Sequence, residues 1–216
     1  MAIATGTQIQ TVADLLERLG DIPPARVLMT PTPGTATEED LIAVNDLGHR
    51  ICELVDGALV EKAMGFHESR HALLLTFYIG LFLRDHDLGA VLGADAAMRL
   101  FPGLVRVPDV SFVSWERYPQ DKARIPGVAP DLAVEVLSKS STRKEMERKL
   151  DEYLRAGVRL VWYVDTKARS AKVYDAAGGV RELTETDELD GGDVLPGFRL
   201  SLADWFAEAE RTGPKA

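Results

Sequence analysis

The stretch from His67 to His71 reads HESRH, which matches the H-E-x-x-H pattern of zinc peptidases. In that pattern two histidines one helical turn apart bind zinc, and the glutamate, here Glu68, acts as a general base. A peptidase site also needs a third protein ligand. The extended pattern H-E-x-x-H-x-x-G-x-x-H fails, because Leu74 and Phe77 occupy the positions of its glycine and last histidine. We therefore expect the match to be coincidental, and a zinc metallopeptidase is the lesser hypothesis.

A second chemical signal is a carboxylate inside an apolar strand pattern. The segment LAVEVL, residues 132 to 137, is apolar at every position except Glu135. Such a run is typical of a strand that is covered on both faces. A lone carboxylate there is costly unless it is paired, hydrogen-bonded or bound to a metal. Glu135 is therefore either a metal ligand or a glutamate at the sheet margin, paired with an Arg or Lys from another segment.

Asp109 places another carboxylate in an apolar pattern, VRVPDVSFV. Side chains alternate along a strand, so Asp109 is expected to share a face with Val107 and Ser111. Asp131 precedes the Glu135 strand, but four residues along one strand separate two Cα atoms by roughly 13 Å. Neighbouring strands lie only about 5 Å apart. Asp109 and Glu135 are therefore the carboxylates that we expect to share one ion.

The third candidate lies in TRKEMERKLDEYL, residues 142 to 154, which has the pattern of an amphipathic helix. Lys149 lies at the edge of its apolar stripe, one turn before Tyr153. A solvated lysine paired with Glu145 at i, i+4 is the simpler interpretation. If the helix covers the two carboxylates, Lys149 would instead hold the attacking water or stabilise negative charge on a phosphate.

The first half of the chain predicts a hairpin, a helix and two strands. Two apolar runs around Asp56-Gly57 indicate a β-hairpin. A buried helix is expected from about Phe66 to Asp85. Two strands follow, over residues 89–100 and 103–114.

The second half adds the Glu135 strand, a helix and two or three further strands. Thr142 and Glu145 predict a capping box at the start of this helix, and Gly157 occupies the position of a C-terminal cap. The complete order predicts a mixed α/β fold, with a central mixed sheet flanked by helices and an N-terminal β-hairpin that feeds it.

We expect three parts along the chain. Residues 1–36 would form an N-terminal helix, at about 11–19, and a proline-rich extended arm. Residues 37–210 would form the compact domain, beginning with a short helix, and residues 211–216 a flexible tail.

Composition narrows the function classes. The formal charge of −9 counts against a general nucleic-acid-binding module, because phosphate contacts supply much of the affinity of such proteins. It does not exclude an enzyme with a local basic cleft. A single cysteine, Cys52, excludes an intramolecular disulfide and fits a reducing cytoplasm. We find no signal peptide pattern, and the longest apolar run, residues 72–83, is shorter than the roughly 20 residues that span a bilayer.

These motifs together resemble the PD-(D/E)XK nuclease superfamily. The segments CELVDGALVE and VRVPDVSFVS, with the long run from PDLAVEVLSKSS to KVYD, look closer still to the Uma family of putative restriction endonucleases. The resemblance covers roughly residues 38–175 and is strongest from Pro130 to Asp165. It implies a restriction-endonuclease-like core that uses Mg²⁺ or Mn²⁺, with Asp109 and Glu135 as the metal ligands.

One position departs from the pattern of that superfamily. The usual E-x-K triplet reads Glu135-Val136-Leu137, so the strand lysine is absent and Lys149 is the candidate replacement. The resemblance also makes Glu53, Glu61 and His67 candidate residues at the margin of the site, with Glu61 and His67 as the preferred pair.

The sequence thus predicts a cytoplasmic, metal-dependent endonuclease that hydrolyses phosphodiester bonds of DNA, although the sequence does not distinguish DNA from RNA. Arg143, Lys144 and Arg148 are candidate phosphate contacts, with a solvated helix face as the alternative. A homodimer, in which the arm exchanges between subunits, is a further hypothesis. The alternative function is a catalytically degenerate nuclease fold that serves as a binding module.

Overall fold

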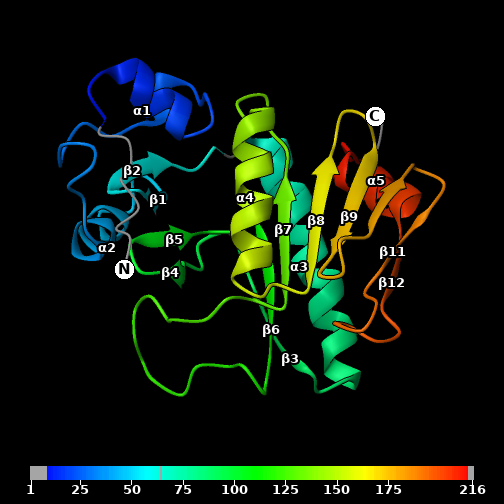
Figure 1. Cartoon of the computed structure of the whole chain (residues 1–216). Helices are drawn as coiled ribbons and strands as arrows, with labels where there is room; N and C mark the ends of the chain where they lie inside the picture. Colours follow the sequence, from blue (N-terminus) through cyan, green and yellow to red (C-terminus); the bar gives the residue numbers. More distant parts are fainter. Residues whose placement is uncertain (1–8, 64, 214–216) are drawn as a thin grey trace.

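The computed structural model describes residues 9–63 and 65–213. Its core is a six-stranded sheet with the strand order β10-β9-β8-β7-β6-β3 (Figure 1). The pair β7–β8 is parallel and the other neighbours are antiparallel, so the sheet is mixed. The strands of this sheet are β3 (Gly89–Leu92), β6 (Val110–Ser114), β7 (Leu132–Val136), β8 (Leu160–Asp165), β9 (Ser170–Asp175) and β10 (Val180–Leu183).

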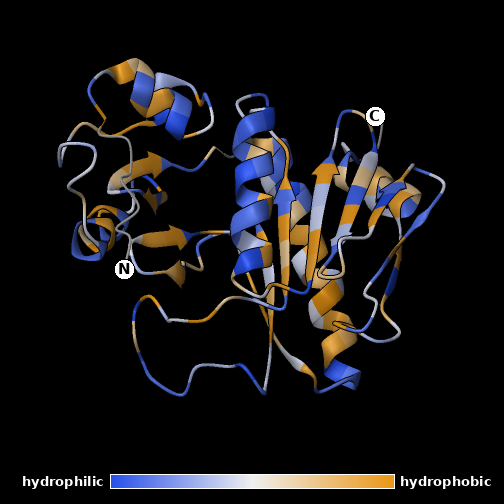
Figure 2. Ribbon diagram, viewed as in Figure 1, coloured by the Kyte–Doolittle hydropathy of each residue, from blue (hydrophilic) through white to orange (hydrophobic). Residues whose placement is uncertain are grey.

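Helices cover both faces of this sheet. α3 (Phe66–Asp85) and α5 (Leu202–Ala209) pack together on one face, where Leu75 is fully buried. α4 (Arg143–Arg155) covers part of the other face through Tyr153. In Figure 2 most residues of α4 are hydrophilic, whereas the neighbouring strands of the sheet contain many hydrophobic residues. Across the described residues, no helix has both the length and the hydrophobicity that a membrane crossing requires.

A second, four-stranded sheet stands beside the first, with the strand order β2-β1-β5-β4 (Figure 1). Its strands are β1 (Cys52–Val55), β2 (Ala58–Glu61), β4 (Met98–Phe101) and β5 (Leu104–Arg106). The predicted hairpin is confirmed, because β1 and β2 are joined by Asp56 and Gly57, with φ values of 50° and 72°. Two consecutive left-handed residues are what a type I′ hairpin turn requires.

The residues before Thr37 pack against this hairpin. The N-terminal helices are α1 (Val12–Arg18), the 3₁₀ helix η1 (Pro24–Arg26) and α2 (Glu38–Asp46). Leu15 and Ile22 are buried with Val60 of β2, and the amide of Leu28 donates to the carbonyl of Leu59 over 2.9 Å. The extended stretch therefore follows the hairpin strand closely.

The two long strands predicted for residues 89–100 and 103–114 are each divided between the two sheets. β3 and β6 belong to the six-stranded sheet, whereas β4 and β5 belong to the four-stranded one. The second division falls at Pro108, which lacks an amide donor and cannot continue a strand ladder. The alternation predicted through Asp109 is therefore broken, and Val107, Asp109 and Ser111 do not belong to one strand.

The predictions for the two main helices are mostly confirmed. α3 has the predicted bounds, and α4 ends before Gly157, which has a φ of 87°. The capping box is only half formed. Thr142 accepts a hydrogen bond from the Glu145 amide, but the Glu145 carboxylate is paired with Arg26. The small sheet of β11 (Glu188–Asp190) and β12 (Arg199–Ser201), together with α5, was not predicted.

Candidate active site

Asp109 is held against the end of β7 by backbone hydrogen bonds. Its amide donates to the Val134 carbonyl over 2.9 Å, and its Oδ2 accepts from the Val136 amide over 2.6 Å. Because β6 pairs Val110 with Val134, the residue before β6 comes opposite Glu135. The structure therefore brings the two predicted carboxylates together across neighbouring strands.

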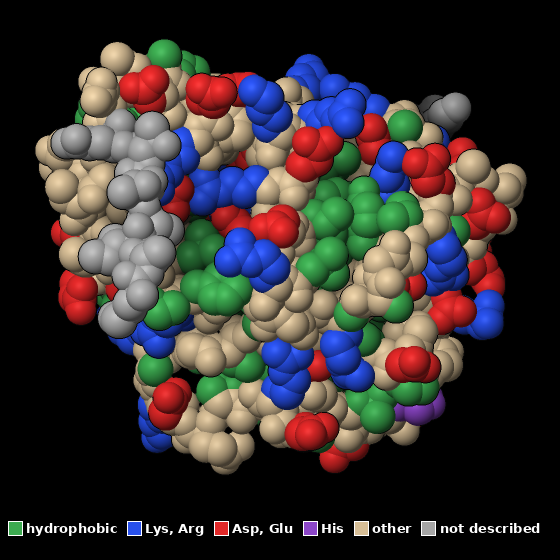
Figure 3. All heavy atoms as spheres, viewed as in Figure 1, with side chains coloured by type: hydrophobic (Ala, Val, Ile, Leu, Met, Phe, Trp, Pro, Cys, Tyr) green, Lys and Arg blue, Asp and Glu red, His purple; other side chains and the backbone are tan. Residues whose placement is uncertain are grey.

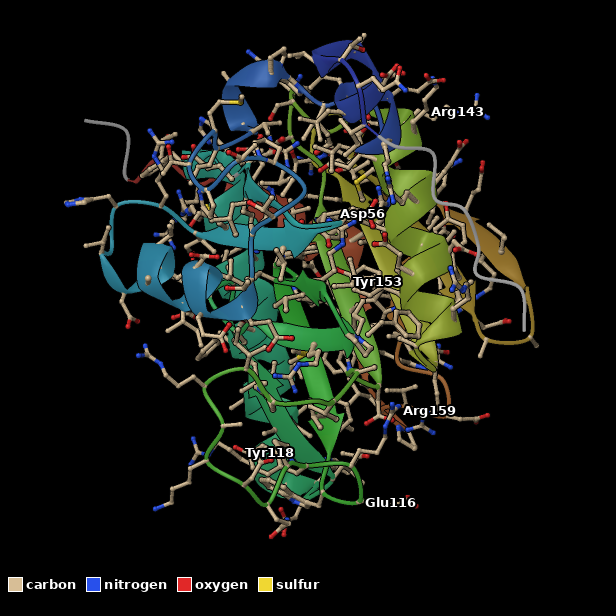
Figure 4. All side chains as sticks on the ribbon, turned by 60° about the vertical axis from the view of Figure 1, so that its left-hand side comes forward. Asp56, Glu116, Tyr118, Arg143, Tyr153 and Arg159 are labelled. Carbon is tan, nitrogen blue, oxygen red and sulfur yellow. The ribbon has the colours of Figure 1, made fainter. Side chains whose placement is uncertain are left out.

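Glu135 is 5% exposed and is held from above by α4. Its Oε1 accepts from the Lys149 ammonium at 3.0 Å and from the Tyr153 hydroxyl at 2.6 Å. Lys149 and Tyr153 are one helical turn apart, so both side chains leave the same face of α4. Figure 4 shows Tyr153 between α4 and the sheet, whereas Arg143 extends outward from the first turn of the helix.

Glu53 of β1 completes this cluster from the second sheet. It is fully buried, and its carboxylate accepts from Arg106 at 2.7 Å and from the Val107 amide at 3.1 Å. The Lys149 ammonium lies 3.1 Å from the same carboxylate, so it bridges Glu53 and Glu135.

The protonation of these groups follows from burial and pairing. Burial raises the pKa of Glu135 and would also raise that of Glu53, but Lys149 and Arg106 together hold the pKa of Glu53 far below its usual range. Burial would lower the pKa of Lys149, yet Glu135 and Glu53 outweigh that effect and raise it. Lys149 is therefore an ammonium ion that can stabilise negative charge, and it is not a general base.

Lys62 is a site residue that the sequence interpretation missed. It directly follows β2, its side chain is 4% exposed, and its Nζ lies 2.8 Å from Oδ1 of Asp109. The same ammonium donates to the Ala94 carbonyl over 3.1 Å. One signal was present in the sequence: along the strand Lys62 shares a face with Ala58 and Val60, both of which are buried.

These groups line a small cavity of about 10 Å³, at the low end of the volume that one water molecule needs. The charged side chains around it are Arg26, Lys62, Asp109, Glu135, Glu145 and Lys149. The cavity shares Leu137, Ser141 and Met146 with a wider groove between α4 and strands β8 and β9. The groove and the cavity therefore adjoin at these three residues.

The donor set suits a hard divalent cation. Asp109 Oδ1 is buried and has no aligned hydrogen-bond donor among the described residues, although the Lys62 ammonium lies within ion-pair distance. Mg²⁺ is usually held by one or two carboxylates together with water and substrate phosphate. Asp109 and Glu135 meet that requirement. In residues 9–63 and 65–213 no group of three or more His, Cys, Asp and Glu side chains is arranged to hold an ion.

The other predicted residues at the site margin lie farther out. Glu61 pairs with Arg50 at 3.3 Å, and His67 is exposed at the start of α3; neither lines the cavity. Among the three candidates from the resemblance, Glu53 is the one that contacts Lys149, which also contacts Glu135.

The predicted phosphate contacts on α4 differ in the ion pairs that they already form within the protein. Arg143 is almost fully exposed at the groove and pairs with its own-helix neighbour Glu147, whereas Lys144 pairs with Asp21. Arg148 contacts both Asp56 and Glu152. Figure 3 shows basic and acidic side chains interspersed over this face, without a continuous basic surface.

The two histidines of HESRH lie in different environments, one buried and one exposed. His71 is 3% exposed and packs edge-on against Trp205 of α5, while its Nδ1 lies 2.8 Å from the His67 carbonyl of its own helix. His67 is exposed on the outside of the molecule. Within the described residues, no group of three or more His, Cys, Asp and Glu side chains is arranged around them to hold an ion.

Comparisons with known proteins give a family and a similar fold. The family model of Uma2, described as "Putative restriction endonuclease", matches residues 40–203. A solved structure described as a putative nuclease belonging to DUF820 from Anabaena variabilis is similar, with a TM-score of 0.67 and 19% identity over 74% of this chain and 92% of that chain. At this identity the likeness shows the fold. None of the curated proteins compared with the chain matches it.

Proposed function

Because the chain belongs to the Uma2 family of putative restriction endonucleases, we propose that it is a divalent-metal-dependent endonuclease that hydrolyses phosphodiester bonds of DNA. The observation that carries the proposal is the meeting of Asp109, Glu135 and Lys149 at one cavity beside an open groove. The nuclease-like fold of the similar solved structure supports it.

In this proposal Asp109 and Glu135 hold Mg²⁺ or Mn²⁺, which when bound supplies an activated water and offsets charge on the scissile phosphate. Lys149 stays protonated next to Glu135 and stabilises the negative charge that develops on the phosphate. Tyr153 fixes the Glu135 carboxylate by its hydrogen bond to Oε1. Glu53, which is itself held by Arg106, positions Lys149 from the second sheet.

The first experiment is cleavage of supercoiled plasmid DNA with Mg²⁺, Mn²⁺ or EDTA. The wild type should nick or linearise the plasmid with either metal and not with EDTA. Glu135→Gln should lose at least about 100-fold in rate, because it removes a charged ligand at the reacting centre. Glu188→Gln, an exposed carboxylate on β11 that lines neither the cavity nor the groove, is the matched control and should cleave like the wild type.

The same assay distinguishes the endonuclease proposal from the peptidase hypothesis. His71→Ala, checked for folding by circular dichroism, should retain metal-dependent cleavage because His71 lies under α5, away from the cavity. Plasmid cleavage by the wild type that survives both Glu135→Gln and Asp109→Asn would contradict the proposed ligand set.

One observation favours the degenerate binding module as a second candidate. Each carboxylate of the cluster is already paired with a buried cation, Asp109 with Lys62 and Glu135 with Lys149. These pairs offset the charge of both carboxylates without a metal. Metal-independent binding of a labelled DNA duplex, with no cleavage under any metal, would identify this alternative.

We further propose that the protein acts in the cytoplasm as a homodimer that uses α3. The exposed side chains of Phe66, Leu73, Phe77 and Leu81 are spaced so that they lie along one face of that helix. A contiguous apolar stripe of this kind is typical of an interaction surface. A second copy of the chain could cover it by an isologous contact of the two α3 helices.

A further inference from the structure

We propose that Lys62 is an internal counter-ion that occupies the metal-binding oxygen of Asp109 and must be displaced when the divalent cation binds. The inference rests on the proposed metal site, and it adds that the Lys62 ammonium competes with the divalent cation for Asp109. The first observation is the geometry. The Lys62 ammonium lies 2.8 Å from Oδ1 of Asp109, whereas Oδ2 accepts a hydrogen bond from the Val136 amide.

The second observation is the shape of the contact. Asp109 Oδ1 is buried, yet the ammonium is not aligned to donate a hydrogen bond to it. The Lys62 ammonium donates instead to the Ala94 carbonyl. Lys62 therefore satisfies the charge of Asp109 without satisfying its hydrogen-bonding capacity, so an ion that coordinates Oδ1 directly would be a better partner.

The third observation is the charge balance of the buried cluster. Its five carboxylates are already balanced by five cations: Glu53, Asp109, Glu135, Glu145 and Glu152 against Arg26, Lys62, Arg106, Arg148 and Lys149. A divalent cation added to this set would leave an excess of positive charge. If Lys62 leaves as the ion enters, that excess is reduced by one charge.

The fourth observation is space. The cavity of about 10 Å³ holds at most one water, whereas Mg²⁺ keeps several waters and needs oxygen ligands at 2.0–2.1 Å. Lys62 lines this cavity, and in the described part of the chain its ammonium makes one hydrogen bond, to the Ala94 carbonyl, besides its ion pair with Asp109. Rotation of the Lys62 side chain would open room next to Asp109 while the backbone stays in place.

The test is the affinity of the metal-free protein for Mn²⁺ alone, measured by electron paramagnetic resonance of free Mn²⁺ without DNA. Lys62→Met keeps the length of the side chain and removes its charge, so it should bind Mn²⁺ at least about tenfold more tightly than the wild type. Lys139→Met, an exposed lysine just after β7, is the matched control and should change the affinity less than about twofold. Equal or weaker binding by Lys62→Met overturns the inference.

Two further variants keep the test decisive. Adding Asp109→Asn to Lys62→Met should abolish the gain in affinity, and a gain that persists overturns the inference. If Lys62→Met does not fold without metal, Lys62→Gln replaces it, since its amide can still donate to Asp109. If neither variant folds, Mn²⁺ should restore folding because it replaces the missing charge, and no restoration overturns the inference.

The two proposals can fail separately. DNA cleavage by the wild type together with unchanged Mn²⁺ affinity in Lys62→Met removes only the role of Lys62. Tighter Mn²⁺ binding through Asp109 without any DNA cleavage removes only the endonuclease activity. No Mn²⁺ binding by either protein overturns both.

Discussion

Replacing Lys149 by methionine should destabilise the protein by about 3–5 kcal/mol at neutral pH, the usual cost of breaking a buried ion pair by removing one partner. The ammonium lies between Glu135, at 3.0 Å, and Glu53, at 3.1 Å, and its side chain is only 5% exposed. Glu53 would keep Arg106 and the Val107 amide. The cost should therefore correspond to one broken pair, that of Glu135.

The assay is urea unfolding followed by circular dichroism, in EDTA, at pH 8 and pH 5. Without Lys149 the pKa of Glu135 should rise further, because burial is then opposed by less positive charge. A carboxyl with a raised folded-state pKa stabilises the fold when protonated, and that stability is lost as pH rises through the folded pKa. The deficit of Lys149→Met should therefore be larger at pH 8 than at pH 5.

A double-mutant cycle isolates the pair. Glu135→Gln added to Lys149→Met should recover stability at pH 8, because it removes the uncompensated charge. Lys172→Met, which breaks an exposed pair with Glu182, is the control and should cost less than about 1 kcal/mol. A loss below about 1 kcal/mol for Lys149→Met, or no coupling with Glu135→Gln, would refute the buried ion pair as described.

Three further outcomes are expected. Tyr153→Phe should cost about 1.5–3 kcal/mol of unfolding free energy, measured by urea unfolding, because it removes a hydrogen bond to the charged Glu135; a neutral effect would contradict that bond. Asp131→Asn should make the stability of the protein fall less steeply at acid pH. Burial would raise the pKa of Asp131, but hydrogen bonds from Ser114 and the charge of Arg117 outweigh it and lower that pKa. The stabilisation by the Asp131 carboxylate is therefore present above about pH 4 and is lost as pH falls further, and an unchanged pH dependence of thermal melts in this range would contradict the prediction. Leu73→Glu should convert the proposed dimer to a monomer in size-exclusion chromatography with light scattering, whereas an unchanged mass for the wild type and variant would exclude α3 as the interface.

Local signals in the sequence were enough to predict many of the helices and strands. Asp56-Gly57 predicts the hairpin because few residues accept two left-handed positions, and the bounds of α3 follow from its helical pattern. Glu135 stood out because a carboxylate in a strand buried on both faces needs a partner. In each case the signal depends on residues close in the chain, which is why it is visible without a structure.

The positions of Asp109 and Lys62 depended on tertiary structure. The apolar run through Asp109 matches one continuous strand, yet the chain passes from one sheet to the other at Pro108, and Asp109 is turned onto β7 by the Val136 amide. Lys62 has only one local signal in the sequence, the strand face that it shares with Ala58 and Val60, and that signal does not show which group the ammonium contacts. Only the packing of the second sheet against the first buries it next to Asp109.

The sequence by itself determined that carboxylates from two neighbouring strands and a lysine from the next helix belong to one domain. It did not determine which margin residue joins them. Glu61 and His67 were preferred over Glu53, but Glu53 is the one beside Lys149, because β1 pairs with β5 and β5 leads directly to Asp109. Charges on separate sheets interact only after long-range strand pairing has fixed their distance, and no spacing along the chain encodes that distance.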